Sequence, residues 1–422
     1  MERKITDDLL KWKADQNKKP MLLYGVPLCG KTHTVLEFGK NHYKNVIYFD
    51  CVFNLELSYV IDKNSTTDKL IRGLSAISLE TIFKEESLII FDNVTDKVLN
   101  SIKKVFNNNS SYHIIAITNS WDIINKQEGV MVKRMGLVTF FEYLKYIDKE
   151  QLISFIENSF KNGRSMPFHN MAMEAYNDFV LTGGYPSAIV NFKENQDYNM
   201  LTSVHDKNIV MIKNKLLNLD NLIDIKRGNQ VYNNMAVQLL KENKKFLYGL
   251  LRTGARAKEY ERIIKFLDDN NIAIKSPRVN ALTSPLSKIK SDDNFKLYFN
   301  DSGVLYKKMN VNANRLLTND KLMRVIYENN IVSTLKQNGL NIYHYHSDGK
   351  AEIDIVVQTR TGKVIPMEIV SGEDNTKSKS LTLAINKYNI DVAIRFTDEN
   401  FRKKKNIRYI PYYAACLISE TF

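Results

Sequence analysis

One short stretch near the N-terminus has the residue types and spacing that bind a phosphate. Gly25, four further residues and then Gly30-Lys31-Thr32 follow the apolar segment 21–24 and precede a helix-forming segment. The glycines let successive N–H groups turn toward an anion, and the start of the following helix is electropositive. Lys31 would reach the β- and γ-phosphates, and Thr32 would offer its hydroxyl to Mg²⁺. We therefore expect ATP and Mg²⁺ to bind a loop made of Gly25, Val26, Pro27, Leu28, Cys29, Gly30, Lys31, Thr32 and His33.

Asp92 is the second residue expected to hold the magnesium ion. It follows the apolar run 88–91, at the end of a predicted strand. The next residue, Asn93, stands where a glutamate often orients the attacking water. Because an amide cannot accept the proton of that water, we expect slow ATP hydrolysis with Lys31, Asp92 and Asn93 at the catalytic centre. Asp96 is a nearby acid that could replace the missing glutamate.

The segments that must position these residues alternate between strand and helix patterns. Strands are predicted at 21–24, 45–50, 87–92 and 113–118, with helical stretches between them. Such alternation favours a parallel α/β sheet with its ligand at the carboxyl ends of the strands. Asn119 follows the last of these strands and suits a turn or a helix cap.

Three later stretches resemble a known family. VTFFEYL (138–144), a Gly-Gly-Tyr-Pro element at 183–186 and a longer element at 284–307 occur in this order. Together they resemble a broad bacterial and archaeal family of AAA-type P-loop ATPases with a C-terminal winged-helix-like and PD-(D/E)XK nuclease-like region. The resemblance covers nearly the whole chain. The matching residues are Gly183, Gly184, Tyr185, Pro186, Pro285, Leu286, Phe295–Tyr298, Asp301 and Gly303.

The resemblance implies an α/β fold with several modules. It implies a P-loop AAA-type ATPase core at 1–145, a helical lid or linker at 146–235, a winged-helix-like domain at 236–310 and an α/β PD-(D/E)XK-like domain at 311–422. It also makes Asn119 a candidate sensor of the γ-phosphate, with the turn interpretation still open. Arg134 lies near the place of a Gly-Arg pair that the family often has, but its spacing differs, so no arginine finger is assigned.

The segment 244–280 has the pattern of two helices followed by a strand, similar to a helix-turn-helix with a wing. Its basic residues could line one side of the second helix and contact DNA. They could equally belong to a solvated helix that packs against the ATPase, and this second interpretation is slightly favoured because no side-chain pair for base readout stands out. The residues in question are Arg252, Arg256, Lys258 and Arg262.

Three acids near the C-terminus follow the order of a PD-(D/E)XK core. Such a core has a helix with an acid, a strand with an aspartate and a strand with Glu-x-Lys. Glu328 lies in the helical segment 322–339, Asp354 in a predicted strand, and Glu368 in the next one. Residues Asp354 and Glu368 should lie side by side on adjacent strands, where two carboxylates can bind Mg²⁺ and polarise a phosphodiester.

The lysine of that pattern is missing, because Val370 occupies its place. A lysine would stabilise developing negative charge, and valine cannot. Lys377, Lys379 or Lys387 could supply the charge from the following helix. We therefore expect weak or no nuclease activity from a degenerate site.

The formal net charge of +13 is uneven, at +2 for residues 1–150 and +11 for the remainder. A basic C-terminal two-thirds favours a polyanionic partner such as DNA, although a solvated lysine-rich surface, RNA or an acidic protein partner stay open. No apolar run is long enough for a membrane helix. The cysteines Cys29, Cys51 and Cys416 form no metal-binding spacing and suit a reducing, cytoplasmic location. The oligomeric state is not predicted.

Two classes of function follow. In the first, ATP controls a conformational switch, and a nuclease-derived C-terminal region binds DNA or a protein partner. In the second, the chain is an ATP-regulated DNA endonuclease of a defence system or a mobile element.

Overall fold

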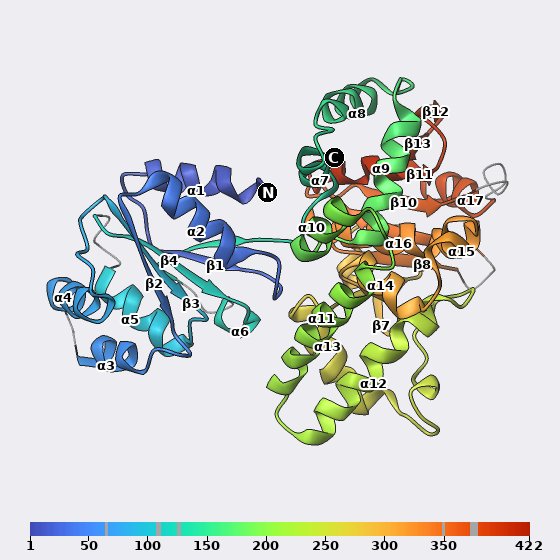
Figure 1. The fold of residues 1–422 in the computed structure, drawn as a ribbon. Helices are drawn as coiled ribbons and strands as arrows, with labels where there is room; N and C mark the ends of the chain where they lie inside the picture. Colours follow the sequence, from blue (N-terminus) through green and yellow to red (C-terminus); the bar gives the residue numbers. More distant parts are fainter. Residues whose placement is uncertain (64–65, 107–110, 125–127, 348–350, 372–378) are drawn as a thin grey trace. The chain divides into compact units, whose positions relative to one another are not determined.

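The computed structural model describes residues 1–63, 66–106, 111–124, 128–347, 351–371 and 379–422. The chain folds into two compact units, unit 1 (Met1–Leu137) and unit 2 (Val138–Phe422), which are drawn in Figure 1. The change of unit comes before the expected boundary at residue 145, because the helix at 140–146 packs within unit 2. Each unit contains its own sheet with helices, which confirms the α/β fold class.

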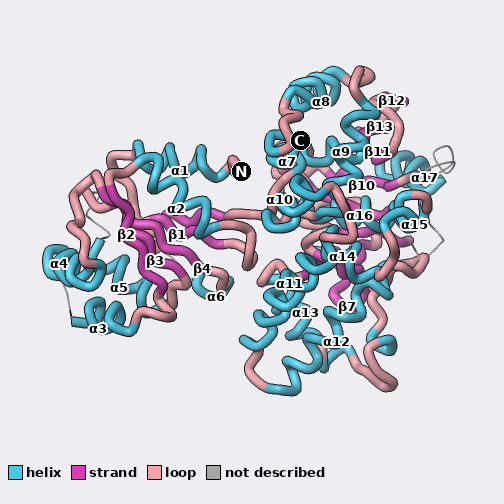
Figure 2. The backbone as a smooth tube through the Cα atoms, viewed as in Figure 1, coloured by secondary structure: helices cyan, strands magenta, loops and turns pink. Residues whose placement is uncertain are grey.

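Unit 1 is built on a parallel sheet with the strand order β2-β3-β4-β1-β5 (Figure 2). Helices α3, α4 and α5 supply the core on one face, while α1 and α2 lie on the other. β3 and β4 are buried throughout, as strands covered on both faces are. The elements are α1 (Ile5–Ala14), β1 (Met21–Tyr24), α2 (Lys31–His42), β2 (Asn45–Asp50), α3 (Leu55–Lys63), α4 (Thr67–Ser78), β3 (Ser87–Asp92), α5 (Asp96–Phe106), β4 (His113–Thr118), α6 (Trp121–Ile124) and β5 (Met131–Arg134).

The parallel register brings the carboxyl ends of four strands to one edge of this sheet. Tyr24 at the end of β1 lies opposite Thr118 at the end of β4, and Asp50 at the end of β2 lies opposite Asp92 at the end of β3. The residues that follow these strands are therefore neighbours, although they are far apart in sequence. β5 is a strand that the sequence did not predict, because it is short, only half-buried and ends in two charged residues.

Unit 2 begins with helices and continues into a second sheet. Its first helix, α7, starts with a capping box between Thr139 and Glu142, which gives these two residues of the VTFFEYL stretch a structural role. The helices are α7 (Phe140–Tyr146), α8 (Gln151–Asn162), α9 (His169–Thr182), α10 (Pro186–Asn195), α11 (Leu201–Asn214), α12 (Leu222–Leu239), α13 (Glu261–Asp269), α14 (Ser302–Met309), α15 (Ala313–Leu317), α16 (Asp320–Gln337) and α17 (Lys379–Tyr388), with short 3₁₀ turns η1 (Lys215–Asn218), η2 (Tyr248–Leu250), η3 (Ala257–Glu259), η4 (Leu286–Lys288) and η6 (Tyr412–Leu417).

The sheet of unit 2 has the order β12-β13-β11-β10-β9-β8-β6-β7. β6 pairs in parallel with β8, so the hairpin expected in a winged-helix-like domain and the strands expected in a nuclease-like domain belong to one continuous sheet. The expected boundary at residue 310 therefore does not divide the sheet. Its strands are β6 (Ala273–Val279), β7 (Lys290–Phe299), β8 (Tyr343–His346), β9 (Glu352–Gln358), β10 (Val364–Ile369), β11 (Ala393–Thr397), β12 (Arg402–Lys404) and β13 (Ile407–Pro411).

The Gly-Gly-Tyr-Pro element meets the Asp-x-Gly element in the core of unit 2. The buried Asp301 carboxylate accepts hydrogen bonds from the N–H groups of Gly184 at 2.7 Å and Val304 at 2.8 Å. Gly183 has a φ of 76°, and a Cβ there would lie 2.5 Å from an Asp301 oxygen. The carbonyl of Gly184 in turn accepts from the N–H of Val138, the first residue of unit 2. These family residues therefore have a structural role where the chain enters unit 2.

Candidate nucleotide-binding site

The loop between β1 and α2 has the shape of an anion-binding turn. Leu28 and Gly30 have φ values of 62° and 94°, so the backbone turns through left-handed geometry just before α2. A Cβ on Gly25 would lie 2.1 Å from the carbonyl oxygen of Met135, so a larger residue does not fit there. The free N–H groups at the start of α2 face this loop. His33 differs from the other predicted loop residues, because its exposed ring lies beside Glu37 on the helix surface.

The ammonium group of Lys31 is fixed at the mouth of the loop. It donates to the carbonyl oxygens of Gly25 and Val26, both at 2.9 Å, and to Asn119 Oδ1 at 2.6 Å. Burial lowers the pKa of Lys31, while the nearby Cys29 and Asp92 partly offset this effect. Phosphate oxygens are stronger acceptors for an ammonium group than neutral carbonyls are. The structure thus brings the predicted phosphate ligand Lys31 into contact with Asn119; the sensor role of Asn119 stays a prediction.

The two residues predicted to hold Mg²⁺ lie together. Thr32 Oγ1 donates to Asp92 Oδ2 at 2.6 Å, and the hydroxyl of Tyr48 donates to the same oxygen at 3.1 Å. Burial, followed by the charge of Asp92, raises the pKa of Tyr48 above its ordinary value. A hydroxyl and a carboxylate beside a phosphate-binding loop are the oxygen ligands that Mg²⁺ takes at nucleotide sites. The donor set therefore fits Mg²⁺.

Asn93 is held by an acid that the sequence did not reveal as part of the site. Its φ is 54°, its N–H donates to Asp92 Oδ1 at 2.8 Å, and its Nδ2 donates to Asp50 Oδ2 at 3.0 Å. The signal for Asp50 was a polar residue at the end of the predicted strand 45–50. Asp96, the substitute acid expected from sequence, is instead an exposed residue at the start of α5.

The loop is also tied to the segment that leads into unit 2. Arg3 donates from one guanidinium nitrogen to the carbonyl of Cys29 at 2.7 Å and from the other to the carbonyl of Gly136 at 2.8 Å. The Cys29 thiol contacts the carbonyl of Met135 at 3.6 Å. Arg134 ends β5 opposite Tyr24, and burial lowers its pKa. A displacement of the loop would therefore move residues 134–136.

In unit 2, each of two predicted nuclease-like acids has its own cation. β9 and β10 are adjacent and antiparallel, as predicted. Asp354 lies 3.3 Å from Arg324 and accepts from the N–H of Ile369, whereas Glu368 lies 3.1 Å from Arg395 and accepts from an N–H of α17. Both carboxylates are thus already neutralised by a guanidinium.

The third acid, Glu328, belongs to a buried ion network. It pairs with Lys244 and accepts from the Tyr298 hydroxyl at 2.6 Å, while the buried Lys296 pairs with Glu352 at 2.9 Å. Burial alone would raise the pKa of Glu328, but Lys244 and Lys296 hold it below its ordinary value. Over the described ranges, no group of three or more His, Cys, Asp or Glu is placed to hold a metal ion.

The lysines considered as replacements for the missing one lie elsewhere or cannot be described. Val370 is buried, and Lys379 is an exposed residue at the start of α17. The ammonium of Lys387 lies 5.1 Å from the centre of the neighbouring Tyr388 ring. Lys377 falls outside the described residues.

Of the two helices predicted in 244–280, only the second forms, and the strand predicted after it is β6. The first pattern forms only the 3₁₀ turns η2 and η3, with Gly254 at a φ of 72° between them, and α13 begins after them. Arg252 pairs with Glu259 at 2.5 Å, and Arg262 on α13 pairs with Asp220. These arginines serve contacts within unit 2. Arg256 and Lys258 lie at η3, outside α13.

Comparisons with known proteins give the following matches. Two family models match within unit 2, Domain of unknown function (DUF8612) over residues 173–315 and Domain of unknown function (DUF4143) over residues 325–415. No curated protein matches the chain. Similar solved structures include the Walker-type ATPase PABY2304 of Pyrococcus abyssi, with 13% identity, a TM-score of 0.40, and coverage of 74% of this chain and 96% of that one.

Two further structures are similar to the chain at the same identity. The Aeropyrum pernix ORC1 protein, solved in complex with DNA, has 13% identity, a TM-score of 0.29, and coverage of 73% of this chain and 90% of that one. The STAND protein PH0952 of Pyrococcus horikoshii, which has a tetratricopeptide repeat sensor, has 13% identity, a TM-score of 0.30, and coverage of 80% of this chain and 45% of that one.

Among the described helices, none is both long enough and apolar enough to cross a membrane.

Proposed function

We propose that unit 1 binds ATP·Mg²⁺ and hydrolyses it slowly, as a P-loop ATPase of the AAA type. The observation that carries this proposal is the convergence of Lys31, Thr32, Asp92 and Asn119 at the carboxyl edge of a parallel sheet. Lys31 neutralises phosphate charge, and Thr32 and Asp92 hold the metal, which would polarise the γ-phosphate. The start of α2 adds N–H donors to the same anion.

Asp50 is the group we assign to accept the proton of the attacking water. Asn93 would orient the water. Of the two acids that accept hydrogen bonds from Asn93, Asp92 is assigned to the metal, which leaves the Asp50 carboxylate. The water oxygen bonds to the γ-phosphorus, the bond to ADP breaks, and the water proton passes to Asp50.

The hydrolysis step is tested by turnover of the full chain. Asp50→Asn keeps an oxygen that can accept from Asn93, but it cannot take a proton. We expect ATP affinity close to wild type and turnover lower by roughly 10²-fold, the lower end of what a general base contributes. The matched control is Asp96→Asn, which should hydrolyse ATP like wild type. Wild-type turnover in Asp50→Asn, or a loss in the control, would overturn the assignment.

We further propose that ATP acts as a switch whose effect reaches unit 2 along the chain. Support comes from the contacts of Gly25 and Cys29 with Met135 and from the bond of Val138 to Gly184. The residues between these anchors are covalently continuous, so a nucleotide that moves the loop also moves the start of unit 2. The role assigned to unit 2 is binding of DNA or of a protein partner. The alternative, an ATP-regulated endonuclease, is less well supported, because Glu328, Asp354 and Glu368 each pair with a cation.

A further inference from the structure

A surface that we call the basic hairpin surface gathers cations from two parts of unit 2 that are far apart in sequence. Helix α8 and the hairpin β12–β13 line one cavity of about 150 Å³, whose lining includes four cations and no acid. Figure 1 shows α8 and this hairpin at the same end of unit 2. The surface consists of Lys161, Arg402, Lys403, Lys404, Lys405 and Arg408.

The positive charge of this surface is largely unneutralised within the chain. Lys403 lies directly opposite Arg408 in the antiparallel pair, and like charges in that position destabilise a sheet. In the part of the chain that the structure describes, Arg402 pairs with Glu399 at 2.8 Å, and Lys403 to Lys405 have no ion pair. An anion from outside the chain would relieve this repulsion.

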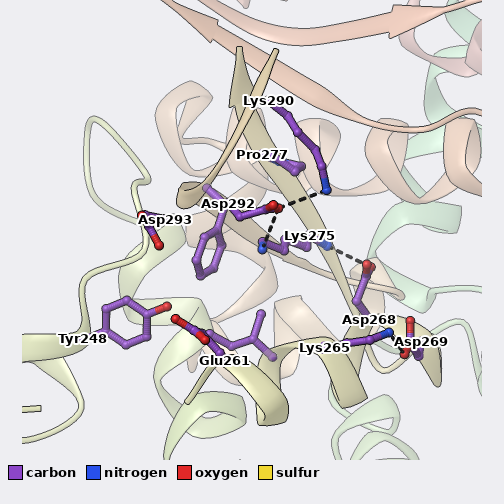
Figure 3. Close-up of a pocket in the computed structure, with 12 residues that line it drawn as sticks. Tyr248, Glu261, Lys265, Asp268, Asp269, Lys275, Pro277, Lys290, Asp292 and Asp293 are labelled. Carbon is purple, nitrogen blue, oxygen red and sulfur yellow. Dashed lines mark hydrogen bonds and ion pairs between the residues drawn. The ribbon is translucent and has the colours of Figure 1, made fainter. Parts of the chain in front are cut away.

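In the pocket beside β6, β7 and α13, by contrast, the cations are paired with acids. It has a volume of about 450 Å³ and is lined by lysines and by a larger number of acids (Figure 3). Lys290 pairs with Asp292 at 3.0 Å, Lys275 reaches the same carboxylate at 3.5 Å, and Lys265 pairs with Asp269 at 2.6 Å. The lysines around this hairpin are therefore neutralised by acids of the same pocket, which makes it a poor site for a polyanion.

The guanidinium groups of the basic hairpin surface are held by aromatic rings. Arg402 lies 3.7 Å from the centre of the Tyr409 ring, and Arg408 lies 5.2 Å from that of Phe422. Such cation–π contacts restrain the guanidinium groups, whose N–H groups can still donate to a phosphate. Lysines on an edge strand also prevent pairing between sheets, which would account for β12. That explanation does not cover Lys161, which lies on a helix and lines the same cavity.

We propose that the basic hairpin surface binds the phosphate backbone of a nucleic acid without reading its sequence. The inference rests on the part of the proposed function that gives unit 2 a binding role, and it names both the surface and the partner. Lysine and arginine contacts to phosphates are salt-sensitive, because each one releases counterions from the nucleic acid.

The test is fluorescence anisotropy of the full chain with a labelled DNA duplex between about 50 and 200 mM salt. The variant is Lys403→Gln/Lys404→Gln/Lys405→Gln, and the control, matched in charge, is Lys241→Gln/Lys245→Gln/Lys258→Gln. We expect the first variant to bind more weakly at low salt and to lose roughly 0.9 of the log–log salt slope for each contact removed. The control should bind like wild type.

Equal DNA affinity in the wild type and the hairpin variant would overturn the proposal. So would wild-type binding to vesicles of anionic phospholipid with none to DNA, since that would identify a lipid surface. ATP binding is measured on the same samples. Loss of DNA binding with intact ATP binding supports this surface, whereas failure of ATP binding in the wild type would count against the proposed function of unit 1 alone.

Discussion

Replacing Glu328 with leucine should strongly destabilise unit 2. The carboxylate is 1% exposed, pairs with Lys244, whose side chain is 9% exposed, and accepts a hydrogen bond from Tyr298. Glu328→Leu leaves a buried ammonium and a buried hydroxyl without this acceptor. Removing one partner of a buried pair costs about 3–5 kcal/mol. With roughly 2–4 °C per kcal/mol for a large domain, the melting temperature should fall by about 6–20 °C.

Tryptophan fluorescence can follow the unfolding of unit 1 separately from that of unit 2. Both tryptophans, Trp12 and Trp121, lie in unit 1, whereas circular dichroism detects the helices of both units. Glu328→Leu should lower the unfolding transition seen by circular dichroism and leave the tryptophan fluorescence transition nearly in place. The double variant Lys244→Met/Glu328→Leu should recover most of the loss, because an apolar replacement of a buried ion pair is often neutral.

The contribution of Glu328 to the stability of unit 2 should decrease in acid. The pKa of Glu328 is below its ordinary value, so its contribution is complete above about pH 4.3 and is lost as the pH falls toward the lowered pKa. The stability difference between wild type and Glu328→Leu should therefore shrink in acid. The reasoning is refuted if Glu328→Leu stabilises the protein, as expected of an acid kept for catalysis at the expense of stability.

Three other outcomes are expected. Gly183→Ala should destabilise unit 2 in urea by roughly 1–3 kcal/mol, because its φ is 76° and the Cβ meets Asp301; Gly163→Ala, with a φ of 64° and open space around it, should have the smaller effect, and equal effects would remove the role given to Asp301. Asn93→Glu, which the sequence alone predicts to speed up ATP hydrolysis, should not do so, because the new carboxylate would lie beside Asp50 and be repelled; faster turnover would show that Asp50 is not involved. Plasmid DNA should not be nicked in Mg²⁺ or Mn²⁺, with or without ATP, and cleavage that disappears in Asp354→Ala would revive the endonuclease interpretation.

The sequence predicted those parts of the site whose residues are consecutive. The loop from Gly25 to Thr32 carries its own spacing, and Asp92 follows a strand that is apolar enough to recognise. Asp50 ends a predicted strand, but only the register of β2 with β3 brings it beside Asp92, and β5 forms only by pairing with β1.

For the nuclease-like acids too, the sequence predicted the local elements but not the partners that come from elsewhere in the chain. The spacing of Asp354 and Glu368 correctly placed them on adjacent strands. Their neutralising partners Arg324 and Arg395 come from α16 and β11, and no sequence spacing links these residues in advance. The prediction of a first helix in 244–280 failed for a different reason. The apolar periodicity outweighed Gly254, which adopts a φ of 72° where that helix would continue.

The most direct test of the central claim is calorimetric titration of the full chain with ATP, with and without Mg²⁺, in wild type, Lys31→Ala and the control Lys40→Ala on the same helix. The account predicts binding that Mg²⁺ strengthens in wild type and in Lys40→Ala, and no measurable binding in a Lys31→Ala variant whose circular dichroism and melting match wild type. Wild-type ATP affinity in that folded Lys31→Ala variant would contradict the account.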